Sequence, residues 1–349
     1  MRSNCPHFLS FTPYLRQAVW GGTQLTDLLG KQLESGSLCA ESWELFDRTS
    51  HACVVDSGLL KGLPIQRLLS EYSTEIFGKA QQVTPFPLLA KFLDVEQPTS
   101  IQVHPTASTI AEFNEQDSPK TEAWYVIAVT EQAKVHAGLK AGIDLASFQK
   151  KLEQQQTEAI LDCMNEYIPK PGDCILIPAG VVHTMGGGLV VAEIQQSSEL
   201  TYRVHDWGRG RDSSRSLQRQ QAKALHAMQS IWELGEGAQA RIDPACESSE
   251  CQQGYRQRIV DAAFEMSVLH FNRNEASPFP LKTEDSPQIL MVLEGAGQLK
   301  TAEQTRLVTA GQTLLVPAAT GDYTCEVTGA EDSNLRLLVV DFGKSLIKS

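Results

Sequence analysis

The sequence has no long hydrophobic run and no net positive charge, and both absences exclude classes of protein. No apolar run in its 349 residues is long enough to cross a bilayer, so we expect no membrane span. The N-terminal Met-Arg-Ser-Asn-Cys-Pro-His lacks the apolar core of a secretory signal, which predicts a cytoplasmic protein. The net charge of −12 argues against nucleic-acid binding, which normally requires a basic surface. An anionic small substrate is still possible, because a few local Lys and Arg can form a positive pocket.

The eight cysteines lack any Cys-x-x-Cys pair and any zinc-knuckle spacing. In a chain of this size we expect them to be reduced and mostly buried. Cys246 and Cys251 could form a bridge only in an oxidising compartment, which no other feature of the sequence indicates. We therefore expect no disulfide framework.

The length favours two domains, and hydrophobic periodicity shows where helices and strands alternate. Three segments have helical spacing, at about 63–78, 143–165 and 219–234. From about residue 255 onward the chain reads as short, regularly spaced strands, a pattern typical of a sandwich or jelly roll. We therefore predict a mainly β protein with domains at 1–235 and 236–349, joined by a linker within residues 235–243.

The segment Ser100–Pro105, Ser-Ile-Gln-Val-His-Pro, alternates polar and apolar residues. In a strand this places Ser100, Gln102 and His104 on one face and the apolar residues on the other. Three polar side chains on an interior-facing strand are costly unless something satisfies them. A metal ion and a polar substrate would do so.

Two later segments supply partners for this face. Lys120 and Glu122 share one parity of a second strand, and a Pro178-x-Gly180 turn presents His183. Two histidines, a glutamate and the Gln102 amide oxygen form a mixed nitrogen and oxygen ligand set. Such a set suits zinc or another first-row divalent ion with positions left open for substrate.

The frame Gly172-x5-Pro178-x-Gly180-x2-His183 resembles the second signature of cupins, small jelly-roll barrels that hold a metal in the barrel mouth. His104 and Glu122 meet the first cupin signature loosely, with a longer spacer. The C-terminal half repeats the frame as Gly311-x5-Pro317, but no histidine follows it. We therefore predict two cupin-like jelly rolls, of which only the N-terminal one binds metal. The second would serve packing or oligomerisation, in a monomer or homodimer.

Four segments together resemble type I mannose-6-phosphate isomerases: Ser-Ile-Gln-Val-His-Pro, Lys-Thr-Glu-Ala-Trp-Tyr, Ile-Pro-Ala-Gly-Val-Val-His and Glu-Ile-Gln-Gln-Ser-Ser-Glu-Leu-Thr-Tyr-Arg-Val-His-Asp-Trp-Gly-Arg. With Val-Trp-Gly-Gly and Glu-Ser-Trp-Glu, the resemblance covers most of residues 8–235. It implies one Zn²⁺ per chain, with the ligands Gln102, His104, Glu122 and His183. It also implies Arg203 as the catalytic arginine, and Lys91, Ser100, Lys120 and Arg209 around the sugar phosphate and the reacting carbons.

The reaction implied is the interconversion of mannose 6-phosphate and fructose 6-phosphate through an enediol. Lys120 is a candidate base, while a ligand-shell Glu, a metal-bound water and His205 stay open. Lys91 has two readings: outward snorkelling, or a position in the pocket. The sequence departs from the family where Leu200 replaces a polar residue, and after Arg209, where Arg and Ser are unusually frequent.

Three alternatives share the metal ligands: a non-catalytic sugar-binding cupin acting as sensor or regulator, a cupin isomerase of another sugar, and an iron-dependent dioxygenase. A binding protein would not need Arg203 and Lys120, and both are present. A dioxygenase would not need the Lys, Arg and Ser residues assigned to the phosphate.

Overall fold

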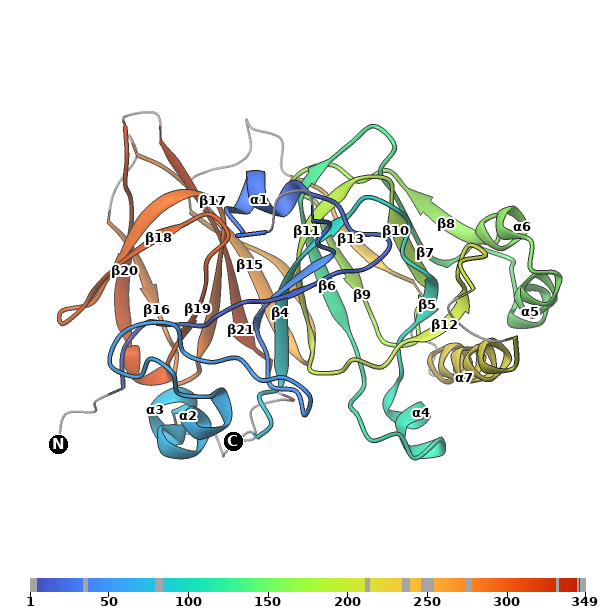
Figure 1. The fold of residues 1–349 in the computed structure, drawn as a ribbon, viewed down its shortest axis with the longest axis horizontal. Helices are drawn as coiled ribbons and strands as arrows, with labels where there is room; N and C mark the ends of the chain where they lie inside the picture. Colours follow the sequence, from blue (N-terminus) through green and yellow to red (C-terminus); the bar gives the residue numbers. More distant parts are fainter. Residues whose placement is uncertain are drawn as a thin grey trace. The chain divides into compact units, whose positions relative to one another are not determined.

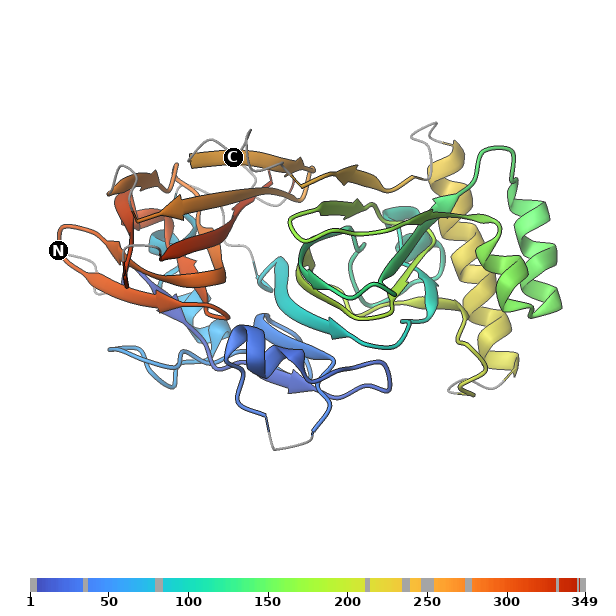
Figure 2. The same cartoon turned by 90° about the horizontal axis from the view of Figure 1, so that it is seen from above.

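The computed structural model describes residues 5–33, 37–78, 84–210, 214–233, 239–245, 254–273, 278–330, 333–343 and 345. These residues form mainly β-structure in several sheets, with a smaller number of helices (Figures 1 and 2), which confirms the predicted class. Among them, no helix is both long and apolar enough to span a membrane.

The chain divides into two compact units. Unit 1 contains Met1–Gln17, Thr23–Phe92 and Cys246–Ser349, and unit 2 contains Ala18–Gly22 and Leu93–Ala245. This grouping differs from the expected division into 1–235 and 236–349, because residues 23–92 cluster with the C-terminal part. The predicted boundary itself and the Cys246/Cys251 pair lie outside the described residues. The assignment of functional domains therefore stays a prediction.

Unit 2 has strands in two sheets. The first sheet has the order β12-β5-β10-β7-β8, and in the second β13, β9, β6 and β11 are consecutive neighbours. The strands are β5 Ile101–Val103, β6 Glu122–Val129, β7 Lys134–Leu139, β8 Met164–Tyr167, β9 Cys174–Ile177, β10 His183–Gly186, β11 Leu189–Gln196, β12 Tyr202–His205 and β13 Arg241–Asp243. The helices are α4 Ala107–Glu112, α5 Leu145–Gln154, α6 Thr157–Leu161 and α7 Ser214–Glu233.

Apolar residues of both sheets pack together inside unit 2. Val135, Ala137 and Met185 of the first sheet share one buried cluster with residues of the second. On its other face the first sheet is covered by α5, α6 and α7 (Figure 1), which pack against Ile101 and Val103. This confirms the predicted alternation in β5, because the two apolar residues face the helices.

Unit 1 has a second β-rich core, built from both ends of the described chain. Its elements are β1 Leu9–Ser10, β2 Tyr14–Arg16, α1 Gln24–Leu29, β3 Glu41–Leu45, α2 Ile65–Glu71, α3 Ser73–Phe77, β14 Gly254–Val260, β15 Phe264–Asn272, β16 Phe279–Lys282, β17 Gln288–Lys300, β18 Thr305–Thr309, β19 Thr313–Val316, the 3-10 helix η1 Ala318–Thr320, β20 Asp322–Val327 and β21 Asn334–Phe342. The division of the chain between the units falls within β4, Leu88–Val95, whose residues up to Phe92 are assigned to unit 1 and whose residues from Leu93 are assigned to unit 2. β1 pairs with β19, Leu9 opposite Leu315, which explains why the N-terminal segment groups with the C-terminal one.

The three predicted helical segments all contain helices, although their limits shift. Residues 63–78 contain α2 and α3, and residues 143–165 contain α5 and α6 before β8 begins at Met164. α7 begins at Ser214, five residues before the expected start at Arg219.

Candidate metal centre and active site

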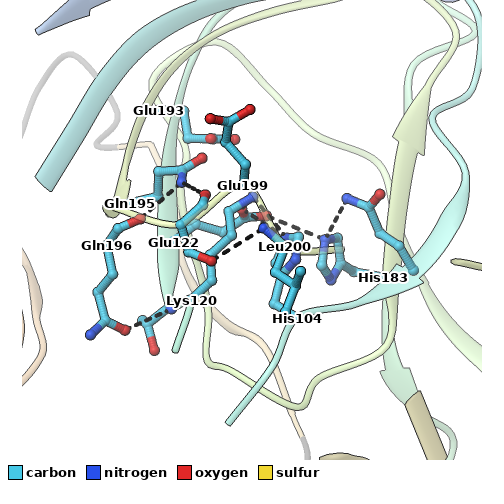
Figure 3. A network of polar contacts seen from close by, with 12 residues as sticks. His104, Lys120, Glu122, His183, Glu193, Gln195, Gln196, Glu199 and Leu200 are labelled. Carbon is cyan, nitrogen blue, oxygen red and sulfur yellow. Dashed lines mark hydrogen bonds and ion pairs between the residues drawn. The ribbon is translucent and has the colours of Figure 1, made fainter. Parts of the chain in front are cut away.

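Three side chains that could bind a metal ion, from three parts of unit 2, converge at one point (Figure 3). His104 follows β5, Glu122 begins β6 and His183 begins β10. His104 Nε2 lies 3.0 Å from Glu122 Oε2, and His183 Nε2 lies 3.3 Å from Glu122 Oε1. Among the described residues, the group of His, Cys, Asp and Glu side chains spaced to hold a metal ion consists of His104, Glu122 and His183. We call it the metal cluster.

Strand register explains the convergence. In β5, Gln102 lies opposite His183 of β10 on one side and opposite Arg203 of β12 on the other. Residues directly opposite in antiparallel strands point to the same face of the sheet. Gln102, His183 and Arg203 therefore share the face that turns away from the helices.

Burial and nearby charges set the protonation states of His104 and Glu122. His104, Glu122 and His183 are each at most 1% exposed. Burial and the adjacent Lys120 lower the pKa of His104 to about 3. Burial alone would raise the pKa of Glu122, but Lys120 and His104 hold it well below its ordinary value. A neutral imidazole and an ionised carboxylate are the forms that bind metal ions.

One donor atom from each of the three residues lies within 4.8 Å of the other two, close enough for the three to share one metal ion. Each His Nε2 lies 3.0 or 3.3 Å from one oxygen of Glu122, near the ~3.3 Å that separates neighbouring ligand atoms when metal–ligand bonds are about 2.0–2.1 Å long. His183 Nδ1 lies 3.0 Å from the Val181 carbonyl oxygen, to which it can donate, so that Nε2 keeps its lone pair for the site. Glu122 Oε2 is buried and accepts no hydrogen bond of standard geometry.

Lys120 places a cation against the same atoms. Its Nζ lies 2.8 Å from Glu122 Oε2 and 3.1 Å from His104 Nε2 (Figure 3). The donor set thus already accommodates a positive charge. The prediction that Lys120 and Glu122 share one face of their strand is confirmed by the contact between their side chains.

The Gln102 amide adjoins the cluster with its nitrogen. Its Nε2 lies 3.2 Å from His183 Nε2, while its Oε1 accepts a 3.0 Å hydrogen bond from Ser100 Oγ. Rotating the amide by 180° would turn the oxygen toward the cluster, and Ser100 Oγ could then accept from the nitrogen. Ser100 and Gln102 are thus adjacent, as the alternation predicted.

The other predicted residues have different surroundings. Lys91 belongs to unit 1 and is 7% exposed; its Nζ lies 3.3 Å from Glu41 Oε2. Outward snorkelling of Lys91 is therefore wrong, because the ammonium is buried against a carboxylate. Arg209 donates to Asp206 Oδ1 at 2.7 Å and to the Pro98 carbonyl at 2.8 Å. The His205 ring hydrogen-bonds Thr157 Oγ1 through Nε2 at 2.8 Å.

Sequence reasoning did not single out two polar residues of β11. Glu193 lies opposite Trp124 and accepts from its indole nitrogen at 2.9 Å, and Gln195 lies opposite Glu122. Both side chains are buried and belong to the polar network around the metal cluster (Figure 3). A usable signal was present, since Glu193 and Gln195 alternate with the apolar residues Ala192 and Ile194 in a strand that begins as a hydrophobic run.

Comparison with known proteins identifies the family. The model of the type I phosphomannose isomerase catalytic domain matches residues 8–134. A mannose-6-phosphate isomerase of Streptococcus mutans is 31% identical over 305 residues, covering 87% of this chain and 90% of that protein. One from Bacillus subtilis is 28% identical over 318 residues, covering 91% and 95%. A crystal structure of mannose 6-phosphate isomerase from Bacillus subtilis superposes with a TM-score of 0.74 at 26% identity, covering 96% of this chain and 99% of that one. The chain therefore belongs to the type I phosphomannose isomerase family.

Proposed function

We propose that the protein interconverts mannose 6-phosphate and fructose 6-phosphate at the metal cluster. The observation that carries this proposal is the buried group of His104, Glu122 and His183 with Lys120 against it. It occurs in a chain 31% identical to a mannose-6-phosphate isomerase over most of both lengths.

In this proposal Gln102, His104, Glu122 and His183 would hold Zn²⁺, Gln102 through its amide oxygen. The donor spacing, the neutral imidazole and the ionised carboxylate support a divalent ion with nitrogen and oxygen ligands. When bound, the ion would supply Lewis-acid polarisation of the sugar oxygens at C1 and C2.

Lys120 is the residue we propose for moving the proton between C2 and C1. A base must lie within hydrogen-bonding reach of the reacting atoms. Lys120 Nζ is within 3.1 Å of two proposed ligand atoms, so it reaches the place where the substrate oxygens would bind. His205 is a weaker candidate, because Thr157 occupies its Nε2.

Arg203 would stabilise the negative charge that develops on the enediol oxygens. It lies opposite Gln102 and shares its face of the sheet, so its fixed charge is directed to the same side as the metal ligands. We assign Ser100, Lys91 and Arg209 to binding of the sugar phosphate. Arg209 would act mainly through its charge, since Asp206 and Pro98 hold its guanidinium.

The finer architecture belongs to the same proposal: two cupin-like jelly rolls, with metal bound only by the N-terminal one, in a cytoplasmic monomer or homodimer. The C-terminal frame Gly311-x5-Pro317 supports this, because Asp322 stands five residues after Pro317, where the N-terminal frame has His183 five residues after Pro178. In the described part of unit 1, no group of His, Cys, Asp and Glu has metal-binding spacing.

A coupled assay tests the proposal. The zinc-loaded protein is given mannose 6-phosphate and fructose 6-phosphate is followed, with free mannose and glucose 6-phosphate as parallel substrates. We expect turnover of mannose 6-phosphate alone, its loss after chelation and its return with zinc. Turnover of another sugar would identify that sugar as the substrate of the isomerase. Zinc binding without turnover of any of these sugars would favour a sugar-binding protein. Activity that survives thorough chelation would remove the metal from the mechanism.

A further inference from the structure

We propose that Thr121, which the mechanism does not use, is a positioning residue for the metal site. This inference rests on the proposed metal site. Thr121 stands between Lys120 and Glu122 in the sequence, so its side chain points away from the face that carries those two. It is nevertheless buried, with 8% of its surface exposed. Its hydroxyl and both of its backbone groups are engaged by other segments.

Those segments include two that border the metal cluster. The Thr121 hydroxyl accepts a 3.2 Å hydrogen bond from the Ala179 amide, in the turn that precedes His183. The Thr121 amide donates to Gln196 Oε1 at 2.9 Å, and the Gln196 amide donates to the Thr121 carbonyl at 3.0 Å. Thr121 thus ties the start of β6 to the Pro178–Gly180 turn and to the end of β11.

The Pro178–Gly180 turn controls where His183 points. Its Gly180 amide donates to the His104 carbonyl at 3.0 Å, which links the turn directly to a second proposed ligand. The Val181 amide closes the turn on the Pro178 carbonyl at 3.1 Å, and the Val181 carbonyl in turn holds the His183 ring at Nδ1. A shift of the turn would therefore move one ligand and rotate another.

Unit 1 contains a similar turn that is held by a threonine hydroxyl and does not lead into a candidate metal ligand. There the Thr283 hydroxyl accepts from the Gly321 amide at 2.9 Å and donates to the Ala318 carbonyl at 2.9 Å, in the turn after Pro317. A threonine hydroxyl thus braces the proline turn in each half of the chain. Only the turn braced by Thr121 leads into a histidine. Thr283 therefore offers a matched control for the loss of a buried turn-bracing hydroxyl.

The test is zinc affinity, measured by competition with a chromophoric chelator, in the full chain. Thr121→Val removes the hydroxyl and keeps the shape, while Thr121→Ser keeps the hydroxyl and removes the methyl group. We expect T121V to weaken zinc binding about 10–100-fold, the range typical for loss of a residue that supports metal ligands. We expect T121S to stay within about threefold of the parent, and T283V to leave zinc affinity unchanged. The visible absorption of the cobalt(II)-loaded protein should change in T121V and not in T121S.

Parent-like zinc affinity in T121V, or equal losses in T121V and T121S, would overturn the positioning role. An equal loss in T283V would do the same. If T121V does not fold, T121A removes the same hydroxyl: affinity weaker than that of T121S supports the proposal, and equal affinity overturns it. A parent protein that binds no zinc would reject the metal site together with this inference. A parent that binds zinc but does not isomerise the sugar would reject the proposed function alone.

Discussion

Substitution of Arg203 tests its proposed role in the reaction separately from metal binding. Arg203 lies opposite Gln102 but is not one of the proposed ligands. We therefore expect Arg203→Ala to lower kcat by about 10²–10³-fold, as for loss of one preorganised group that stabilises developing charge. Zinc affinity and the unfolding midpoint should stay near those of the parent. Steady-state kinetics and zinc titration check this, and an unchanged kcat would remove Arg203 from the mechanism.

Lys31 and Glu44 form a buried ion pair in unit 1. Lys31 Nζ donates to Glu44 Oε1 and to the Gly311 carbonyl, each at 2.6 Å. Burial raises the pKa of Glu44 even though Lys31 opposes the shift. Removing one partner leaves a buried charge, so Lys31→Met should lower the free energy of unfolding by about 3–5 kcal/mol.

Urea denaturation measures this loss, and two further variants control it. The double variant K31M/E44Q should recover at least half of the stability, because it removes the unpaired charge. Substitution of exposed Lys61 by Met should change little. A K31M variant as stable as the parent would mean that the pair contributes no stability.

Asp341 provides a pH-dependent prediction. Burial raises the pKa of this carboxyl, and a hydrogen bond from Gln288 only partly opposes the shift. Since the folded pKa exceeds the unfolded one, the group's stabilising contribution is complete below the unfolded pKa and is lost as the pH rises through the folded value. Asp341→Asn should therefore be more stable than the parent at neutral pH, with the gap closing in acid. Urea titrations at several pH values check this; a gap independent of pH would contradict it.

For single residues, the sequence predicted the contacts made within one strand and the side chain presented by one turn. Ser100 and Gln102 are adjacent because they share a strand face, and His183 reaches the cluster because of its turn. Lys91 shows where this reasoning stops. Its partner Glu41 lies 50 positions away, and no local pattern connects the two. Glu193 was missed because it follows a run of apolar residues, and one acidic residue in such a strand does not by itself predict a functional role.

At the scale of elements, the Pro178–Gly180 turn depends on its glycine. Gly180 has φ +86°, and a Cβ at this position would lie 2.9 Å from the Ala227 carbonyl oxygen of α7. Gly142 has a similar φ of +85° with no atom within 4 Å of the added Cβ. Gly142→Ala should cost about 1–2 kcal/mol through backbone strain alone. Gly180→Ala should cost more, because backbone must move.

Paired urea denaturation of the two alanine variants checks this prediction, with zinc titration as the second measurement. G180A should weaken zinc binding and G142A should not, because only the first turn leads into a proposed ligand. Equal unfolding losses in the two variants would show that the contact with α7 relaxes without cost.

Element type was predictable from periodicity, whereas element limits and partners depended on tertiary contacts. The 143–165 segment reads as helical throughout, yet β8 begins at Met164 because Met164 pairs with Leu139 of β7. β17 runs for 13 residues and pairs with β19 and β21 at one end and with β18 and β20 at the other. The prediction of short strands after about residue 255 is wrong for this segment, since hydrophobic pattern does not show where one long strand changes partners.

For the whole molecule, zinc should stabilise the chain through unit 2. A ligand that binds only the folded state at 100 times its Kd adds about 2.7 kcal/mol. Thermal unfolding with zinc and with chelator should show this difference. Hydrogen exchange should slow in peptides around residues 102–104, 120–122 and 179–183. Equal protection in unit 1 peptides, or none in these, would contradict a site confined to unit 2.

The two compact units were not predictable in this form. Hydrophobic pattern shows which face of a strand is buried, but it does not choose the partner strand. The pairing of β1 with β19 therefore could not be inferred from either segment.

That pairing also has a consequence for synthesis. Leu9 leaves the ribosome long before Leu315, its partner across the ladder. At about 5–20 residues per second, the interval is roughly 15–60 s. All of unit 2 emerges within it and can fold first, while the earliest part of unit 1 waits as a nascent chain with its apolar side chains uncovered. Chaperone occupancy on translating ribosomes should therefore concentrate on the N-terminal segment and end only when the last strands appear.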